Sequence, residues 1–300
     1  MSLPAVAADA DRHPRVLRSR EWRDRRAAHE ERVDALVADH LARRTAGVKH
    51  PVADFLFTYY SWRPTQLRRW HPGAGVVAED ARPEELGPEY VAVPGGAALD
   101  HARVLARRGT VVGEVRALLV ATAGRPAQLG CFGMHEWAMV YHQPAEEIRH
   151  RDWPLRTDPV PVVEQIGVRC SHFDAFRFFT PQARPLNPVQ LTRDGQLAHE
   201  QPGCLHANMD LYRCAYKLSP LIPSELVLEC FELATRIREL DMRASPYDLT
   251  ALGFAPVRVE EPGGRAEYTR LQREFAEQAA PLRARLVHEC DRLLALAEST

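Results

Sequence analysis

The stretch Ser19–Arg44, SREWRDRRAAHEERVDALVADHLARR, sets the first expectation for the fold. Its apolar residues recur at helical spacing, and charged residues fill the positions between them. The apolar stripe consists of Trp22, Val33, Leu36, Val37 and Leu41. This pattern predicts one long amphipathic helix that packs its apolar side against a core.

Helical patterns dominate the rest of the chain as well. Further helices are expected at 51–60, 64–70, 98–108, 110–123, 131–143, 204–218, 223–243 and 264–297, with Pro281 kinking or dividing the last one. Extended segments are expected at 76–77, 90–93, 162–168 and 256–260. Proline-rich loops separate these elements at 144–165 and 181–188. The fold class predicted is mainly α: a single helical domain with long Pro-rich loops and a few short strands. A flexible N-terminal tail is expected over 1–18, and one helical catalytic domain over 19–300.

Composition narrows the class of protein. The chain has 300 residues, of which 45% are hydrophobic and 26% are charged, as in globular proteins that fold in water. Its formal net charge of −1 means that any contact with nucleic acid must come from a local patch. No stretch of 18 apolar residues and no signal peptide is visible, so no membrane contact and a cytoplasmic location are expected. The six cysteines are expected to be free thiols, because the cytoplasm is reducing.

Three cysteines are each followed closely by a histidine and then by a carboxylate. The three sets are Cys131, His135 and Glu136; Cys170, His172 and Asp174; and Cys204, His206 and Asp210. Imidazole, thiolate and carboxylate are the ligands that transition metals prefer, so His135, His172 and His206 are candidate ligands of Zn or Fe. Buried thiols with hydrogen-bonded core histidines, or acid–base chemistry without a metal, are the alternatives.

Two more specific predictions follow from these spacings. The first is that the three histidine rings converge although their segments are far apart in the sequence. The second is that His206 and Asp210, four residues apart, act as a unit on one helix face.

Aromatic residues and arginines gather in two further segments. Tyr59, Tyr60, Trp62 and Arg63 lie close together, and Arg177 lies within a run of phenylalanines. A flat ligand needs aromatic faces for stacking, and phosphates need arginine. These residues therefore predict a pocket for a base or a small aromatic ligand, and core packing is the alternative.

A third polar cluster lies at the end of the helix expected over 223–243. Arg243 is expected to hold an anion that Asp241 orients, unless the cluster only caps the helix.

Four stretches of the chain carry a resemblance to a known family. They are HPVADFLFTYYSWRP (50–64), CFGMHEWAMVY (131–141), CSHFDAFRFFT (170–180) and QPGCLHANMDLY (201–212). Over roughly residues 20 to 298, the chain resembles a family of bacterial proteins commonly named 3-methyladenine DNA glycosylase. The resemblance implies base-excision repair of damaged DNA. It supplies no catalytic motif, so the site residues come from their chemistry alone.

Hydrolysis of the N-glycosidic bond of an alkylated purine requires a carboxylate that positions a water. The candidates for catalysis are Asp210, Asp174, His206 and Glu136. Such a monofunctional hydrolase requires no cofactor. A lyase would need an amine nucleophile, for which Lys217 is the candidate. The alternative function is a metal-dependent enzyme that acts on a small molecule and uses His135, His172 and His206. A binding protein without catalysis is the third class.

Overall fold

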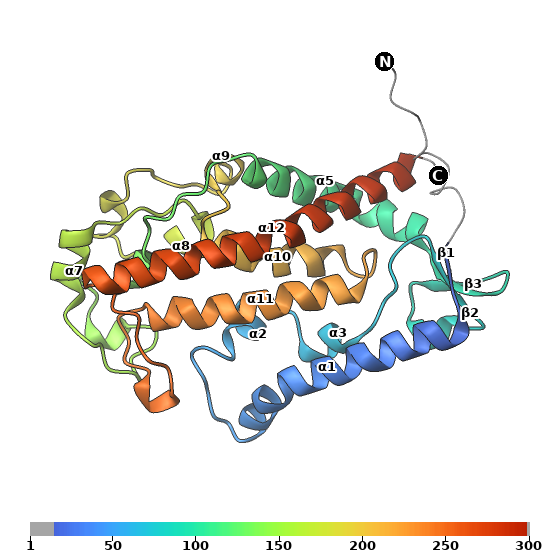
Figure 1. Cartoon of the computed structure of the whole chain (residues 1–300), viewed down its shortest axis with the longest axis horizontal. Helices are drawn as coiled ribbons and strands as arrows, with labels where there is room; N and C mark the ends of the chain where they lie inside the picture. Colours follow the sequence, from blue (N-terminus) through green and yellow to red (C-terminus); the bar gives the residue numbers. More distant parts are fainter. Residues whose placement is uncertain (1–14, 299–300) are drawn as a thin grey trace, which may run out of the picture.

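The computed structural model describes residues 15–298, and α-helices form most of this part of the chain (Figure 1). The predicted mainly α fold is confirmed. The longer helices are α1 (Ser19–Thr45), α5 (His101–Ala123), α10 (Leu205–Leu218), α11 (Ser224–Arg243) and α12 (Pro262–Glu298). Helix α12 packs against α5 and α10, and α11 packs against α10.

Large aromatic side chains fill the core between these helices. Trp22 of α1, Tyr212 of α10 and Tyr268 of α12 are all fully buried. The indole nitrogen of Trp22 donates a hydrogen bond to the backbone oxygen of Glu79 at 2.9 Å, which satisfies its polar atom and ties α1 to the sheet. Of the apolar stripe predicted for the first helix, Trp22, Val33 and Val37 are buried, whereas Leu36 and Leu41 are exposed. The buried face of α1 includes His29 and His40 instead.

A small sheet lies at one end of the molecule, on the right in Figure 1. Its strand order is β1-β2-β4-β3; β1 and β2 are parallel and the other pairs are antiparallel. A Cβ on Gly96 would lie 2.0 Å from the backbone oxygen of Ala78, so only glycine allows β2 and β4 to pair there. The strands are β1 (Arg15–Leu17), β2 (Val76–Glu79), β3 (Tyr90–Val93) and β4 (Gly96–Leu99).

Short helices and loops occupy the remaining chain. Those between α5 and α10 include the predicted Pro-rich loops, and α7 and α8 lie at the end opposite the sheet (Figure 1). The short α-helices are α2 (Phe55–Tyr59), α3 (Pro64–Arg68), α4 (Pro83–Leu86), α6 (Met134–Ala138), α7 (Pro159–Ile166), α8 (Phe173–Phe176) and α9 (Gln196–His199). The 3-10 helices are η1 (Ala145–Glu147), η2 (Arg184–Leu186) and η3 (Thr250–Leu252).

Both strands predicted in the second half of the chain are wrong. Residues 162–168 lie mostly in the helix α7, because Asp158 accepts a hydrogen bond from the backbone nitrogen of Val160 and Pro159 fits the first helical turn. The segment 256–260 joins no strand in the described part of the chain, and residues 259 and 260 lie in a turn. Val257 and Val259 are buried, and the backbone nitrogen of Val257 donates to the backbone oxygen of Arg243 at the end of α11 at 2.9 Å.

Several helices also differ from the predicted ones in where they begin and end. The helices expected at 98–108 and 110–123 are one helix, α5, which continues through Gly109. Helix α12 continues through Pro281 rather than dividing there. The helix expected over 131–143 is only Met134–Ala138, and the one expected over 51–60 is only Phe55–Tyr59.

The flexible N-terminal tail expected over 1–18 is wrong for residues 15–17, which form β1. Residues 15–17 pair with β2 and Ser19 begins α1, whereas residues 1–14 lie outside the described part.

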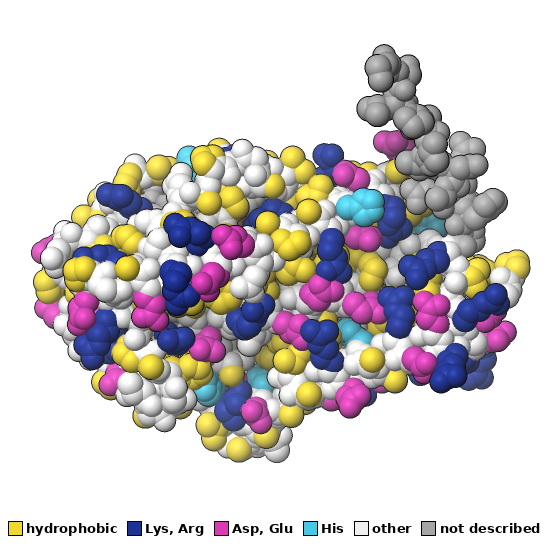
Figure 2. Space-filling model, viewed as in Figure 1, with side chains coloured by type: hydrophobic (Ala, Val, Ile, Leu, Met, Phe, Trp, Pro, Cys, Tyr) yellow, Lys and Arg dark blue, Asp and Glu magenta, His cyan; other side chains and the backbone are white. Residues whose placement is uncertain are grey.

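The molecular surface carries both signs of charge. On the face shown in Figure 2, basic and acidic side chains alternate without a large patch of one sign. Within residues 15–298, none of the helices combines the length and apolar character needed to cross a membrane.

Candidate functional site

The three cysteine–histidine segments meet where three loops run into three helices. Cys131 precedes α6, Cys170 precedes α8, and Cys204 lies at the residue before α10. Left-handed backbone at Phe132 (φ 48°) and Gly133 (φ 69°) makes the sharp turn from Cys131 into α6. A Cβ on Gly133 would come within 3.3 Å of the buried ring of Tyr268. Glycine thus lets the turn approach α12 closely.

A second glycine positions the start of α10. A Cβ on Gly203 would lie 2.6 Å from the backbone oxygen of Gln128, so a larger residue would separate these two segments. The side-chain oxygen of Gln201 accepts hydrogen bonds from the backbone nitrogens of Gln128 (2.8 Å) and Gly203 (2.7 Å). These contacts fix Cys204 and, two residues later, His206.

Of the predicted convergence of the three histidines, the structure shows the two pairs that include His206, whereas His135 and His172 belong to different groups of donor atoms. The ring of His206 lies between the other two, with ring centroids 4.3 Å from His135 and 5.3 Å from His172. Burial lowers the pKa of His206 well below its ordinary value, and the neighbouring His135 acts in the same direction. His206 is therefore a neutral imidazole whose nitrogen lone pair is available to a metal.

His135 belongs to a buried group of charges supplied by α6 and α11. Asp241 pairs with Arg238 through Oδ2 at 2.7 Å, and the same guanidinium nitrogen donates to Glu136 Oε1 at 2.9 Å. The Arg238 guanidinium also lies 3.9 Å from the ring centroid of Phe55. Burial in the helical core makes this pairing necessary, because an unpaired charge there would be strongly destabilising.

Two atoms of this group face each other without a hydrogen bond. Nε2 of His135 lies 2.8 Å from Oδ1 of Asp241, but the geometry is not that of a hydrogen bond, and both buried atoms lack a partner among the described residues. Ligand atoms of His135, His206 and Asp241 all lie within 4.8 Å of one another. Two imidazoles and one carboxylate form a donor set that suits Zn²⁺ or Fe²⁺ and leaves coordination positions open.

His172 belongs to a second group with a similar composition. Its Nε2 lies 3.0 Å from Oδ2 of Asp210 and 3.4 Å from Oε1 of Glu200. Its Nδ1 accepts a hydrogen bond from the backbone nitrogen of Ala175 at 3.3 Å, at the start of α8. A neutral His172 therefore carries its proton on Nε2 and donates it to the carboxylates. This tautomer leaves no nitrogen lone pair for a metal.

The partners of Asp210 also differ from those predicted from the sequence. Its Oδ1 accepts from the hydroxyl of Tyr60 at 2.7 Å, and its Oδ2 contacts Arg213 at 2.6 Å besides His172. Asp210 is thus paired with His172 rather than with His206 as predicted from the spacing. Although burial opposes it, Arg213 and His172 hold the pKa of Asp210 well below its ordinary value. A carboxylate so acidic is a poor general base near neutral pH.

Asp174, another predicted catalytic carboxylate, is enclosed by arginines. Its Oδ1 contacts Arg193 at 3.1 Å and Arg177 at 3.2 Å, and its Oδ2 pairs with Arg213. Although burial opposes it, Arg213 lowers the pKa of Asp174. The arrangement fits a role in orienting arginines rather than in taking a proton.

A cavity with an aromatic lining opens beside His206. Glu136 and His206 both line it, as do Arg238 and Asp174. Of the four residues predicted to be catalytic, Glu136 and His206 therefore face this space without being fully paired, whereas Asp210 does not line it. Its aromatic walls are Phe55, Tyr59, Phe178 and Tyr247. A flat ring fits such walls by stacking.

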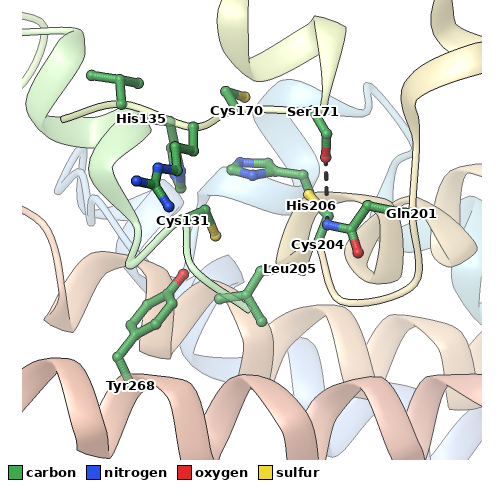
Figure 3. A pocket seen from close by; sticks show the side chains of 11 residues that line it. Cys131, His135, Cys170, Ser171, Gln201, Cys204, Leu205, His206 and Tyr268 are labelled. Carbon is green, nitrogen blue, oxygen red and sulfur yellow. Dashed lines mark hydrogen bonds between the residues drawn. The ribbon is translucent and has the colours of Figure 1, made fainter. Parts of the chain in front are cut away.

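A second cavity lies on another side of His206 (Figure 3). His135 and His206 line it together with the three cysteines at 131, 170 and 204, and Tyr268 closes it from α12. Figure 3 shows the cysteines around the ring of His206, which belongs to both cavities. All six cysteines of the chain are free thiols in the structure.

The predicted aromatic and arginine residues divide into two sets. Tyr59 lines the aromatic cavity, and Tyr60 supports Asp210. Arg177 lies in a more open depression at the mouth of this cavity, which Tyr59 and Arg149 also line.

The other residues that were predicted to contact a ligand lie away from the two cavities. Trp62 stacks on Tyr216 with ring centroids 4.9 Å apart, and Arg63 is exposed at the start of α3. Arg243 donates to the backbone oxygen of Ala255 at 2.9 Å. Trp62, Arg63 and Arg243 line neither of the two cavities, so the structure does not place them with His206.

Sequence reasoning missed several residues of the site. Arg238, three residues before Asp241 on α11, completes the first group, and Glu200 and Arg213 complete the second. The i, i+3 spacings of Arg238 with Asp241 and of Asp210 with Arg213 were a usable signal, because such pairs meet on one helix face. Asp241 was expected to orient an anion beside Arg243, whereas it faces His135.

Comparisons of the chain with protein-family models, curated proteins and solved structures gave no match.

Proposed function

We propose that the protein is a metal-dependent enzyme that acts on a small molecule with a flat ring. His135, His206 and Asp241 would hold the metal, Zn²⁺ or Fe²⁺, and the aromatic cavity beside His206 would hold the ring. The observation that carries the proposal is the approach of His135 Nε2 and Asp241 Oδ1 to 2.8 Å without a hydrogen bond. Although burial opposes it, Asp241 raises the pKa of His135, so a cation between the two atoms is favoured, and a metal ion that replaces the imidazole proton would satisfy both atoms.

The surrounding residues support a hydrolytic reaction. A metal with open positions lowers the pKa of a bound water, which makes it a nucleophile near neutral pH. Glu136 lines the same cavity, and Arg238 orients it by donating a hydrogen bond to its Oε1 at 2.9 Å. Glu136 is therefore placed to receive the proton of the water while the ring of the substrate stacks on Phe55 and Tyr59.

A metal-free DNA glycosylase is the second candidate. The aromatic cavity with Glu136 at its wall favours it, because an extruded purine would stack there beside a carboxylate. Arg149, Arg177 and Arg193 line the open depression at the mouth of the cavity, where they would face phosphates. In this reading Glu136 replaces Asp174 and Asp210 as the residue that positions the water.

One assay separates the two candidates. Protein treated with a chelator, and the same protein reloaded with Zn²⁺ or Fe²⁺, are offered methylated duplex DNA and free methylated purine nucleosides. The metal-dependent function requires turnover of a nucleoside that disappears on chelation and returns on reloading. Release of 3-methyladenine from DNA by the chelated protein would instead establish the glycosylase, and a steep salt dependence would confirm phosphate contacts.

Matched variants assign the activity to the site. Asp241→Asn removes one ligand charge from the first group, whereas Asp210→Asn makes the same change in the second group. Activity that is lost in Asp241→Asn but regained by raising the metal concentration would support ligation. Equal loss in both variants at saturating metal would contradict it.

A further inference from the structure

The open depression at the mouth of the aromatic cavity has a basic lining and is called the basic depression below. Its volume is about 290 Å³, and a water takes up about 30 Å³ in the liquid, so a tetrahedral anion has room there. Separate parts of the chain bring four arginines to it: Arg149 after η1, Arg177 directly after α8, Arg193 before α9 and Arg213 on α10.

Three of these arginines share two carboxylates. Asp174 is the only acidic residue that lines the basic depression in the described part of the chain. Its Oδ1 contacts Arg177 at 3.2 Å and Arg193 at 3.1 Å, and its Oδ2 pairs with Arg213. The second carboxylate belongs to Asp210, which contacts Arg213 at 2.6 Å from outside the depression.

Arg149 is the fourth cation, and its side chain forms no ion pair within residues 15–298. Four guanidinium groups therefore face two carboxylates, which leaves an excess of two positive charges. Pairing with Asp174 also leaves donors free, because a guanidinium has five N–H groups and Arg177 and Arg193 each contact Asp174 through one nitrogen. A bound dianion would neutralise the excess charge and accept from the free N–H groups.

Aromatic rings orient the three exposed guanidinium groups. The central carbon of the guanidinium lies 4.2 Å from the ring centroid of Phe178 in Arg177 and 5.0 Å from that of Phe173 in Arg193. The same atom of Arg149 lies 5.9 Å from the ring centroid of Phe178. A guanidinium that stacks on a ring keeps its N–H edge free for an anion. Side chains that are held in place before binding lose less conformational entropy when the ligand arrives.

The basic depression and the aromatic cavity are continuous. Tyr59, Arg149 and Asp174 line both of them. Phe178, a wall of the aromatic cavity, is 39% exposed and carries Arg177 on its ring. A ligand whose ring enters the aromatic cavity can therefore place a substituent among the arginines.

We propose that Arg149, Arg177 and Arg193 bind the phosphate of a small ring compound, a phosphomonoester such as a nucleoside monophosphate. A phosphomonoester carries a charge of about −1.5 to −2 at neutral pH and has three acceptor oxygens, which match the excess charge and the free N–H groups. A DNA backbone would need cations in a row along its path, whereas these arginines gather around one carboxylate. The inference rests on the proposed function for the position of the ring, and it adds the class of substrate.

The test is the binding of phenyl phosphate and of phenol to the chelated full-length protein, measured by isothermal titration calorimetry. Wild type is expected to bind phenyl phosphate at least about tenfold more tightly than phenol, and inorganic phosphate should compete with it. Arg149→Gln and Arg193→Gln should each weaken the binding of phenyl phosphate about tenfold, whereas Arg149→Lys, which keeps the charge, should lose less. No binding of phenyl phosphate at millimolar concentration, equal affinity for the two ligands, or no effect of either glutamine variant would overturn the proposal.

Arg270→Gln is the matched control. Arg270 is 58% exposed on α12 and pairs with Glu274, much as Arg193 is 62% exposed and pairs with Asp174. The control variant should bind phenyl phosphate like wild type, and an equal loss there would overturn the proposal. Duplex DNA that binds more tightly than phenyl phosphate and dissociates steeply with salt would also overturn it, in favour of a nucleic-acid site.

The variant Asp241→Asn separates this inference from the proposed function. Asp241 lines neither the basic depression nor the aromatic cavity, so the chelated variant should bind phenyl phosphate like wild type. Metal binding without phosphate binding in wild type would refute the present inference alone. Phosphate binding without metal binding would refute the metal site of the proposed function alone.

Discussion

The two histidine–carboxylate groups around His206 contain the same kinds of side chain but differ in their hydrogen bonds. In the group of His172, Glu200 and Asp210, a backbone amide occupies Nδ1, and the remaining polar atoms pair with Tyr60 and Arg213. In the group of His135 and Asp241, Nε2 and Oδ1 lie 2.8 Å apart, and neither atom has a partner with hydrogen-bond geometry in the described part of the chain. The first group is satisfied by hydrogen bonds and ion pairs within the protein, whereas we propose that a cation completes the second.

This difference shows that donor spacing alone does not define a metal site. Both groups bring three donor atoms within 4.8 Å of one another. An imidazole nitrogen can bind a metal only if the ring proton is on the other nitrogen. The hydrogen-bond partners of both nitrogens therefore decide which histidine can offer a lone pair. We therefore assign a structural role to the group of His172 and a ligand role to the group of His135.

The largest expected effect is on stability, in the variant Asp210→Asn. This change leaves the buried Arg213 with less charge compensation and disturbs the contacts to Tyr60 and His172. Breaking a buried ion pair destabilises a protein by about 3–5 kcal/mol, and we expect a loss of this size in the free energy of unfolding. Urea unfolding monitored by circular dichroism measures it.

The control for this variant is Asp34→Asn, which breaks an exposed pair with Arg68. We expect no measurable change in stability there, because solvent screens the pair. An Asp210→Asn protein as stable as wild type but inactive would contradict the structural role of Asp210 and restore it as a catalytic residue.

The second expected effect is stabilisation by bound metal. A ligand at 100 times its dissociation constant stabilises the folded state by about 2.7 kcal/mol. Zn²⁺ or Fe²⁺ should therefore raise the melting temperature of chelated wild-type protein and of Asp210→Asn, but not that of Asp241→Asn. Calorimetry at several metal concentrations measures the shift, and the same shift in all three proteins would place the metal elsewhere.

The smallest expected effect on the free energy of unfolding comes from Tyr60→Phe. Its hydroxyl donates to Asp210 at 2.7 Å, and the loss of a hydrogen bond to a charged group costs about 1.5 kcal/mol when other partners remain. Metal affinity should not change. Tyr59→Phe is the matched control, since Tyr59 lines the aromatic cavity and does not contact Asp210 through a hydrogen bond in the structure. A weakened metal affinity in Tyr60→Phe would show that the two groups act as one.

The sequence predicts the helices and the approach of the histidine rings better than it predicts which side chains pair with each other. The apolar stripe around Trp22 correctly predicts α1, and the repeated Cys–His spacing correctly predicts that the rings of His135 and His172 each approach that of His206. The i, i+4 spacing of His206 and Asp210 misleads, because Asp210 finds His172 and Arg213 instead. Likewise, the valines of 162–168 indicate a strand until the cap at Asp158 is seen. Tertiary contacts decide the pairing of Asp210, which no local pattern contains. The helix start at Asp158 and Pro159 is by contrast a local signal that outweighs the β-branched valines.

The central claim is that the group of His135, His206 and Asp241 binds a metal and the group of His172 does not. The most direct test is the Zn²⁺ or Fe²⁺ affinity of wild type, Asp241→Asn and Asp210→Asn, by equilibrium dialysis with mass-spectrometric metal analysis. We expect one site in wild type and Asp210→Asn, and at least a tenfold weaker site in Asp241→Asn. Equal affinities in Asp241→Asn and wild type, or a loss confined to Asp210→Asn, would contradict the account.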